Sequence, residues 1–225
     1  MTAPGSMTGV LRALAALPRK GRGRAVMIVA ARRGEGASTI ARTIAESASS
    51  GVTLLLDLDL IRSEHRLAYA QAGPPLSEGI DARLKGQRLY RIVDAEGRLR
   101  PDTRGGMAYF RVGRSKLFVS GFDAGAALQE GDRLQVLTGP SYWTAVRQSC
   151  ELCVVDAPAL EDSRVGLSVA AHMDGVVLVA CGATGSVTAS VGLKTELEAA
   201  GAFVMGVVYT RADSGALTLE RLSLG

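Results

Sequence analysis

The 225-residue chain has few aromatic side chains, few cysteines and no long apolar run, and each shortage argues against a class of protein. Phe, Trp and Tyr make up 4% of the residues, which disfavours a surface that binds nucleic acid by base stacking. No apolar stretch approaches the roughly 20 residues that a membrane-spanning helix needs. Three cysteines are typical of a reducing compartment. Cys150 and Cys153 have no second pair or histidine cluster that would complete a zinc site, so we expect core or surface thiols.

Positive charge is present but unevenly placed. The formal net charge is +4, yet residues 1–24 hold five Arg or Lys and no acid, and residues 82–116 hold ten against three acids. We interpret residues 1–24 as a flexible basic segment with a short amphipathic helix over residues 10–17. The second cluster suits an acidic partner segment or an anionic lipid surface. A plain solvated surface is the alternative for both.

An apolar run, a glycine-containing loop and a helical pattern follow one another between residues 24 and 50. Residues 25–30 are an unbroken apolar run that indicates a buried strand, and apolar residues recur at helical spacing over 37–48. In a strand–loop–helix unit of this kind, backbone amides and the helix dipole converge on a phosphate. The alternative is a tight strand-to-helix turn that binds nothing.

The loop departs from the P-loop pattern at two positions. That pattern is Gly, four residues, Gly-Lys, then Ser or Thr. With Gly36 as the second glycine, Ala31 stands at the first glycine position, Ala37 at the lysine position and Ser38 at the hydroxyl position. The backbone cradle is therefore kept, while the charge that grips the outer phosphates is missing. The candidate nucleotide-binding residues are Arg33, Gly34, Glu35, Gly36, Ala37, Ser38 and Thr39.

Apolar strand-like runs and helical patterns alternate along the rest of the chain. This alternation predicts one α/β domain over residues 25–211 with a doubly wound, mostly parallel sheet of the P-loop NTPase type. Within it, residues 86–120 form a basic, strand-containing excursion, and residues 212–225 form a tail. We expect helices over 64–71 and 80–84, a hairpin between 89–93 and 97–100, and strands over 107–112 and 116–120. Strands are also expected over 53–56, 152–155, 176–180 and 203–209, and helices over 141–149, 163–171 and 186–200.

Acidic residues follow two of the expected core strands. Asp57 and Asp59 come after one strand, and Asp156 follows another. Because right-handed crossovers place the carboxyl ends of parallel strands at one edge, these side chains should meet the glycine loop. Mg²⁺ bound with a nucleotide takes carboxylates, a hydroxyl and phosphate oxygens. We therefore predict Asp57, Asp59 and Asp156 as catalytic residues and Ser38, Asp57 and Asp156 as metal ligands, with helix capping as the alternative.

Taken in order, these motifs resemble those of the bacterial tyrosine kinases of capsule and exopolysaccharide synthesis, within the wider group of partitioning and division-site ATPases. The resemblance spans roughly residues 25–211. Arg33-Gly34-Glu35-Gly36-Ala37-Ser38-Thr39 stands where the family has its Pro-Gly-Glu-Gly-Lys-Ser-Thr type of loop. The stretch from Asp57 to Arg62 is similar to the Asp-x-Asp-Leu-Arg-Arg motif, and Asp156-Ala157-Pro158 to the Asp-Thr-Pro motif. The ordered set is more specific than any of its parts.

The chain also departs from that family. Ala37 replaces the P-loop lysine, Ile61 replaces the first arginine of the second acidic motif, and residues 211–225 contain no tyrosine. The resemblance thus implies a degenerate, catalytically weak or inactive component of exopolysaccharide or holdfast synthesis and export. It also implies that the protein binds ATP or ADP weakly together with Mg²⁺, or binds no nucleotide.

The resemblance implies a place for the protein as well. We expect it in the cytoplasm, held at the inner membrane by a co-polymerase partner, with a homo-oligomer left open and neither nucleic acid nor another metal bound. Two alternatives remain: an active ATPase or kinase in which Arg32, Arg33 or Arg42 replaces the lysine, and a positioning ATPase. His65 and His172 are interpreted as a surface and a structural residue.

Overall fold

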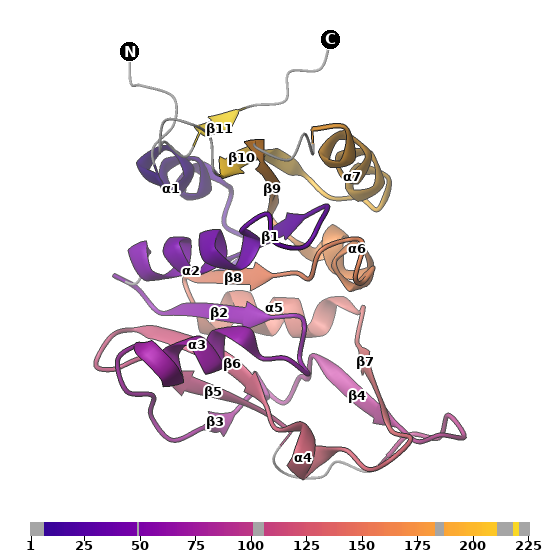
Figure 1. Ribbon diagram of the computed structural model, residues 1–225. Coiled ribbons are helices and arrows are strands. Elements are labelled where there is room, and N and C mark those ends of the chain that lie inside the picture. Colours follow the sequence, from indigo (N-terminus) through magenta and orange to yellow (C-terminus); the bar gives the residue numbers. More distant parts are fainter. Residues whose placement is uncertain (1–6, 49, 101–105, 183–186, 211–217, 221–225) are drawn as a thin grey trace.

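A nine-stranded, mostly parallel sheet forms the centre of the molecule (Figure 1). The computed structural model describes residues 7–48, 50–100, 106–182, 187–210 and 218–220. For residues 187 and 218–220 it describes the backbone only. The strand order is β11-β10-β9-β1-β8-β2-β6-β5-β3. The strands are β1 (Arg24–Ala30), β2 (Thr53–Asp57), β3 (Ile80–Asp81), β5 (Met107–Arg111), β6 (Leu117–Phe122), β8 (Leu152–Asp156), β9 (Gly175–Cys181), β10 (Val204–Thr210) and β11 (Thr218–Glu220).

Helices cover both faces of this sheet. On one face, α1 (Met7–Ala16), α2 (Ala37–Ser47) and α3 (Glu64–Ala72) contribute to one apolar cluster. On the other, α5 (Pro140–Ser149), α6 (Val165–Val169), the 3₁₀ turn η1 (Ala170–His172) and α7 (Val187–Ala199) contribute to a second. A short helix, α4 (Ala124–Ala127), follows β6. The predicted doubly wound α/β fold is confirmed.

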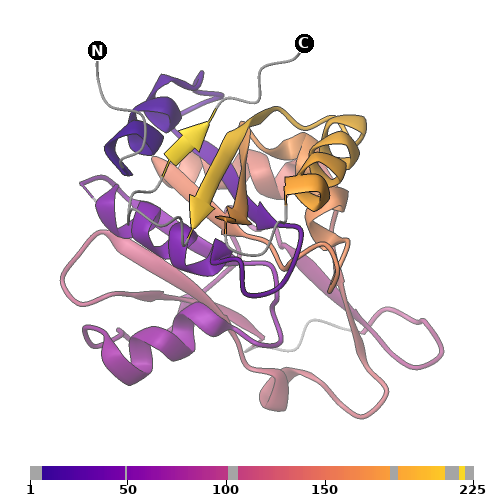
Figure 2. The ribbon, with the colours of Figure 1, turned by 45° about the horizontal axis from the view of Figure 1, so that its top comes forward.

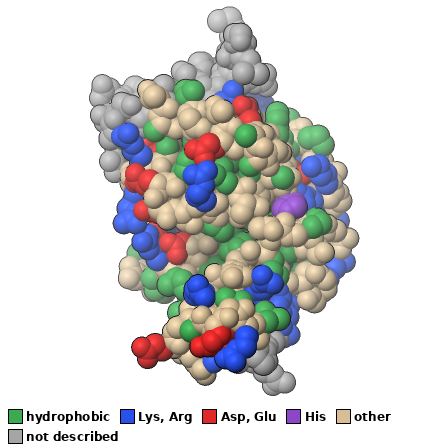
Figure 3. Space-filling view, turned by 90° about the vertical axis from the view of Figure 1, so that its right-hand side faces the viewer, with side chains coloured by type: hydrophobic (Ala, Val, Ile, Leu, Met, Phe, Trp, Pro, Cys, Tyr) green, Lys and Arg blue, Asp and Glu red, His purple; other side chains and the backbone are tan. Residues whose placement is uncertain are grey.

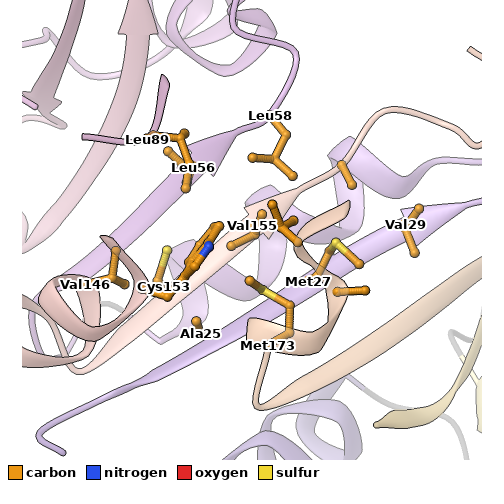
Figure 4. Packing of buried hydrophobic residues seen from close by; sticks show 14 of the residues in the cluster. Ala25, Met27, Val29, Leu56, Leu58, Leu89, Val146, Cys153, Val155 and Met173 are labelled. Carbon is orange, nitrogen blue, oxygen red and sulfur yellow. The ribbon is translucent and has the colours of Figure 1, made fainter. Parts of the chain in front are cut away.

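The core explains why the central strands read as continuous apolar runs. In β1, Met27 and Val29 pack on the face of α5 and α6, whereas Val26 and Ile28 pack on the face of α2. Figure 4 shows the first of these faces, where Met27 lies close to side chains of β8. Because both faces of a parallel strand are covered, no position is left for the polar residues that would produce alternation.

Parallel pairing brings the strand ends to one edge of the sheet. β1 lies between β8 and β9, and β2 pairs with β8 in a register that sets Asp57 beside Asp156. The loop that leaves β1 for α2 lies at this same edge, where it can be followed in Figure 2. The predicted meeting of the glycine loop with both acidic strand ends is therefore present.

The basic excursion is arranged differently from the prediction. Residues 80–84 do not form a helix: Ile80 and Asp81 make a two-residue edge strand that pairs antiparallel with β5. β4 (Tyr90–Val93) pairs with β7 (Arg133–Val136) in a separate two-stranded sheet. The predicted turn after β4 is present, because the Gly97 amide donates to Asp94 O at 3.0 Å and Val93 bridges to Leu99. The predicted strands over 107–112 and 116–120 are confirmed as β5 and β6.

The N-terminal segment packs against the domain through its helix. Its predicted helix is present as α1, but Val10 and Leu14 are buried in the cluster that also holds Ile40 and Ile44 of α2. The Arg24 guanidinium adds two hydrogen bonds, to Leu17 O at 2.6 Å and Ala15 O at 2.7 Å. An apolar helix face of this kind is stabilised by packing and does not lie free. Residues 1–6 lie outside the described part.

The two ends of the predicted domain and the thiols complete the comparison. Residue 211 and most of the tail lie outside the described residues, but Thr218–Glu220 adds an antiparallel edge strand to β10. Cys150, Cys153 and Cys181 are buried, and none of them forms a disulfide bond within the described residues. Burial raises the pKa of the Cys150 thiol to about 12, which keeps it protonated and unreactive at neutral pH.

Candidate functional site

The glycine loop presents unsatisfied backbone amides at the start of α2. Gly34 and Gly36 adopt positive φ angles of 78° and 97°, which residues with a Cβ rarely adopt. α2 begins at Ala37 with no side-chain cap. Within the described part of the chain, no acceptor takes a hydrogen bond from the amides of Gly36, Ala37, Ser38 or Thr39. These donors, together with the helix dipole, are the elements of an anion site.

Contacts from distant parts of the chain hold the loop in shape. The Thr210 hydroxyl, at the end of β10, donates to Glu35 O at 2.6 Å. The φ of Gly36 favours glycine, and a Cβ placed there would also crowd the Thr210 methyl group at 3.2 Å. Glu35 itself is folded inward, where its Oε2 accepts from the Arg32 amide at 3.1 Å.

The loop arginines differ in what they contact. Arg33 donates from its backbone amide to Glu161 and from its guanidinium to both carboxylate oxygens of Asp162, at 3.0 and 2.9 Å. This hydrogen bonding and charge pairing raises the pKa of Arg33. The guanidinium of Arg42 lies over the Tyr69 ring at 5.9 Å. Arg32 lines the pocket, and no described side chain pairs with its guanidinium.

Two buried carboxylates stand side by side below the loop. Asp57 and Asp156 are partners across β2 and β8, and both are almost fully buried. Asp57 accepts from the Asp59 amide through Oδ1 and from the Glu64 amide through Oδ2, each at 2.9 Å. It therefore caps the start of α3, where Ser63 makes no side-chain cap. Asp57 thus lies beside Asp156 at the site and also caps a helix, so both interpretations of this residue agree with its position.

The proximity of these acids changes their electrostatics. Burial and the neighbouring Asp156 carboxylate raise the pKa of Asp57 to about 7, against the opposing effects of His65 and the Asp59 amide. Two carboxylates that share a desolvated site cannot both carry full charge at low cost. A cation placed between them would remove this repulsion, so the pair has the electrostatic character of a cation site.

His65 is a site residue that the sequence interpretation missed. It was expected at the surface, yet it is 0% exposed, and its Nε2 lies 2.8 Å from Asp156 Oδ2. The histidine sits in the first turn of α3, one residue after the amide that Asp57 binds. Its spacing from Asp59 would indicate a position in the site only once the start of a helix is placed at Glu64. His172 lies on the outside, with Nε2 2.5 Å from Thr138 O.

Asp59 lies at the rim of the site. It forms an ion pair with Arg62 at 3.4 Å and accepts from the Arg62 amide through Oδ1. Both of its contacts lie within its own turn, unlike those of Asp57 and Asp156. Asp59 is thus placed to face a ligand at the opening rather than to anchor one inside.

These residues surround a pocket of about 530 Å³. Every predicted site residue from Arg33 to Thr39 lines it, as do Asp57, Asp59 and Asp156. The lining carries six carboxylates, from Glu35, Asp57, Asp59, Glu64, Asp156 and Asp162, against three guanidinium groups, from Arg32, Arg33 and Arg62. Among the described residues, no set of three His, Cys, Asp or Glu could hold a metal ion. A cation here would need phosphate oxygens or waters in addition.

The fold was compared with known proteins. No protein-family model matches the sequence, and no curated protein matches it. Solved structures do match: the chimerical protein CapA2B2 at TM-score 0.59 and 18% identity, over 91% of this chain and 82% of that one. The VpsO kinase domain matches at 0.56 and 18%, over 91% of each chain. The kinase domain of the Escherichia coli tyrosine kinase ETK matches at 0.55 and 18%, over 92% of this chain and 73% of that one.

The chain shares the P-loop-type α/β architecture of these structures. At this identity the likeness extends to the architecture and leaves the chemistry of the site to be argued from its own residues. No helix in the described ranges is both long and apolar enough to cross a bilayer.

Proposed function

We propose that the protein is a kinase-like regulatory or scaffold component of exopolysaccharide or holdfast polysaccharide synthesis and export, with weak or no phosphoryl-transfer activity. The proposal combines the tyrosine kinase domain fold with the pathway that the sequence resemblance implies. The observation that carries it is the charge balance of the pocket. Six carboxylates face three arginines, and the residue at the lysine position is Ala37.

The pocket suits a nucleoside phosphate held together with a divalent cation. The free amides of Gly36 to Thr39 fit phosphate oxygens, and the Asp57–Asp156 pair fits a hard cation. Bound Mg²⁺ would supply charge neutralisation at the phosphates. Without it, the surplus of carboxylates would oppose an anion, so binding should depend strongly on the metal.

Weak catalysis follows from the missing cation. Phosphoryl transfer depends on positioned positive charge, and loss of one such group costs on the order of 10²–10³ in rate. Arg33 is engaged by Asp162 and Arg42 packs on Tyr69, so neither is placed to replace the lysine.

Arg32 favours a second candidate, an active ATPase or kinase with a substituted cation. Its guanidinium lines the pocket and has no partner among the described side chains. In the sequence, Arg32 precedes the loop glycines, whereas α2 begins after them.

The proposal places the protein at the inner membrane through a co-polymerase partner, on the cytoplasmic side, and it leaves homo-oligomerisation open. This part rests on the sequence resemblance and on the basic residues between 83 and 116. Acidic neighbours of Arg98 and Arg100 reduce the net charge of that surface.

The charge at position 37 can be tested directly. Ala37→Lys should strengthen ADP binding in the presence of Mg²⁺ by about tenfold and raise ATP turnover, because it restores the phosphate-facing charge. Ala37→Met is the matched control, since it adds length without charge and should do neither. Calorimetry with and without Mg²⁺ and phosphate release measure the two effects. Rapid wild-type turnover that Arg32→Ala abolishes would favour the second candidate instead.

A cellular experiment separates scaffold from enzyme. In a strain lacking the gene, we expect wild type and Arg32→Ala to restore polysaccharide export equally, because export needs the folded protein rather than turnover. Failure of the gene's loss to alter polysaccharide output would contradict the pathway, whatever the binding data show.

A further inference from the structure

The two carboxylate oxygens of Asp156 differ in their contacts: one meets a buried histidine, and the other is buried without a partner. Asp156 Oδ2 lies 2.8 Å from His65 Nε2. Asp156 Oδ1 is buried and makes no hydrogen bond within the described chain. Asp156 lines the pocket, whereas His65 is not among the lining residues. Asp156 therefore contacts the buried histidine through one oxygen and also contributes to the lining of the pocket.

The neighbouring aspartate has no such unused oxygen. Asp57 accepts an amide hydrogen on each oxygen, from Asp59 and from Glu64. An unsatisfied buried carboxylate oxygen costs free energy unless a ligand meets it. Of the two carboxylates, Asp156 is thus the one whose free oxygen calls for a cation.

Neighbouring hydrogen bonds fix the helix start that carries His65, whose own Nδ1 makes no hydrogen bond within the described chain. The histidine occupies the first turn of α3, whose start is capped by Asp57. The preceding Ser63 donates to Leu60 O at 2.9 Å and accepts from the Phe122 amide at 2.9 Å. The imidazole is fully buried, so it has no solvent-exposed alternative position.

We propose that His65 is a positioning residue for a divalent cation: it binds Asp156 through Oδ2 and so orients Oδ1 toward a hard cation in the pocket. The inference deepens the proposed nucleotide site and rests on it for the source of the remaining ligands. Groups that orient a metal ligand in this way commonly contribute about 10- to 100-fold in metal affinity. His65 does not contact the phosphates.

The test compares two amides of similar polarity at position 65. Gln places its Nε2 near the position of the imidazole Nε2, whereas Asn is one methylene shorter and cannot reach Asp156. Purified full-length wild type, His65→Gln, His65→Asn and His172→Ala are titrated with Mn²⁺ alone, with Mn²⁺ and ADP, and with ADP in EDTA. Electron paramagnetic resonance counts free Mn²⁺, and calorimetry measures ADP binding. Near-ultraviolet circular dichroism shows that each variant has a packed core.

We expect His65→Asn to weaken Mn²⁺ binding about tenfold or more, and His65→Gln and His172→Ala to stay within about threefold of wild type. ADP binding in EDTA should be the same in all four proteins, since His65 acts through Asp156. Mn²⁺ affinity that is unchanged or higher in His65→Asn overturns the inference, as does the absence of any Mn²⁺ binding by wild type. If wild type binds Mn²⁺ in a His65-dependent way but does not bind ADP, the proposed nucleotide function is overturned and this inference stands.

Discussion

At the scale of single residues, the site is defined by what its carboxylates contact. Asp57 and Asp156 could be placed together from sequence, because each follows an apolar run of strand length and parallel strands end at one edge. The hydrogen bonds of Asp57 to the Asp59 and Glu64 amides could not, since they depend on the tight turn before α3. His65 was missed because a lone histidine carries no periodic signal that separates a buried position from an exposed one.

The raised pKa of Asp57 predicts a pH-dependent stability. Its carboxyl has a pKa of about 7 in the folded protein against 3.8 as the reference value. The folded state therefore holds the proton between these values, and the free energy of unfolding falls as pH rises through this window. Between pH 5 and 7, wild type should lose about 2 kcal/mol relative to Asp57→Asn. Urea unfolding in EDTA at each pH measures this difference, and parallel pH profiles of the two proteins would contradict it.

At the scale of elements, strands buried on both faces were predictable and edges were not. β1, β2, β8 and β9 read as apolar runs because helices cover both their faces. β3 and β7 were missed because each is short and is defined by a partner distant in sequence: Ile80 pairs with Tyr109, and Arg133 with Val93. Helix α1 was predicted, but its docking on α2 was not, since an amphipathic helix does not reveal what covers it.

Docking of α1 predicts a measurable contribution to stability. Leu14 is buried in the cluster between α1 and α2, whereas Thr8 on the same helix is exposed. Leu14→Ala should lower the free energy of unfolding by about 2–4 kcal/mol, as removal of a buried leucine side chain does. Thr8→Ala is the control and should change it by less than about 0.5 kcal/mol. Equal effects of the two changes in urea unfolding would show that α1 does not pack on the domain in solution.

At the scale of the whole molecule, the basic excursion is less positive than its sequence suggests. Arg98 pairs with Asp94 and Glu96, and Arg100 pairs with the buried Asp132. In Figure 3 the projecting lower part shows acidic and basic side chains close together rather than one continuous basic patch. Arg91 differs, because its guanidinium donates to the neutral side chain of Gln135 rather than to an acid.

This difference predicts which arginine recruits a partner. Arg91 flanks a hollow of about 430 Å³ beside β4, β7 and the start of α5. Changing Arg91 to Ala should reduce co-sedimentation of the protein with inner membranes, and the loss should resemble that caused by raised salt. Arg98→Ala is the matched control, since acidic neighbours already compensate its charge. If Arg98→Ala reduces sedimentation as much as Arg91→Ala, or if wild type never sediments, this hollow is not the docking surface.

The position of β1 has a consequence for the protein while it is being made. β1 is hydrogen-bonded on one side to β8 and on the other to β9, so Arg24 lies opposite Leu152 and Val26 opposite Gly175. A ribosome that has released the first strand must therefore add more than a hundred residues before either partner emerges. The glycine loop waits longer still, since Thr210 is among the last residues of the domain to be translated. The apolar first strand thus stays unpaired for most of synthesis and is a natural substrate for chaperones that bind nascent chains.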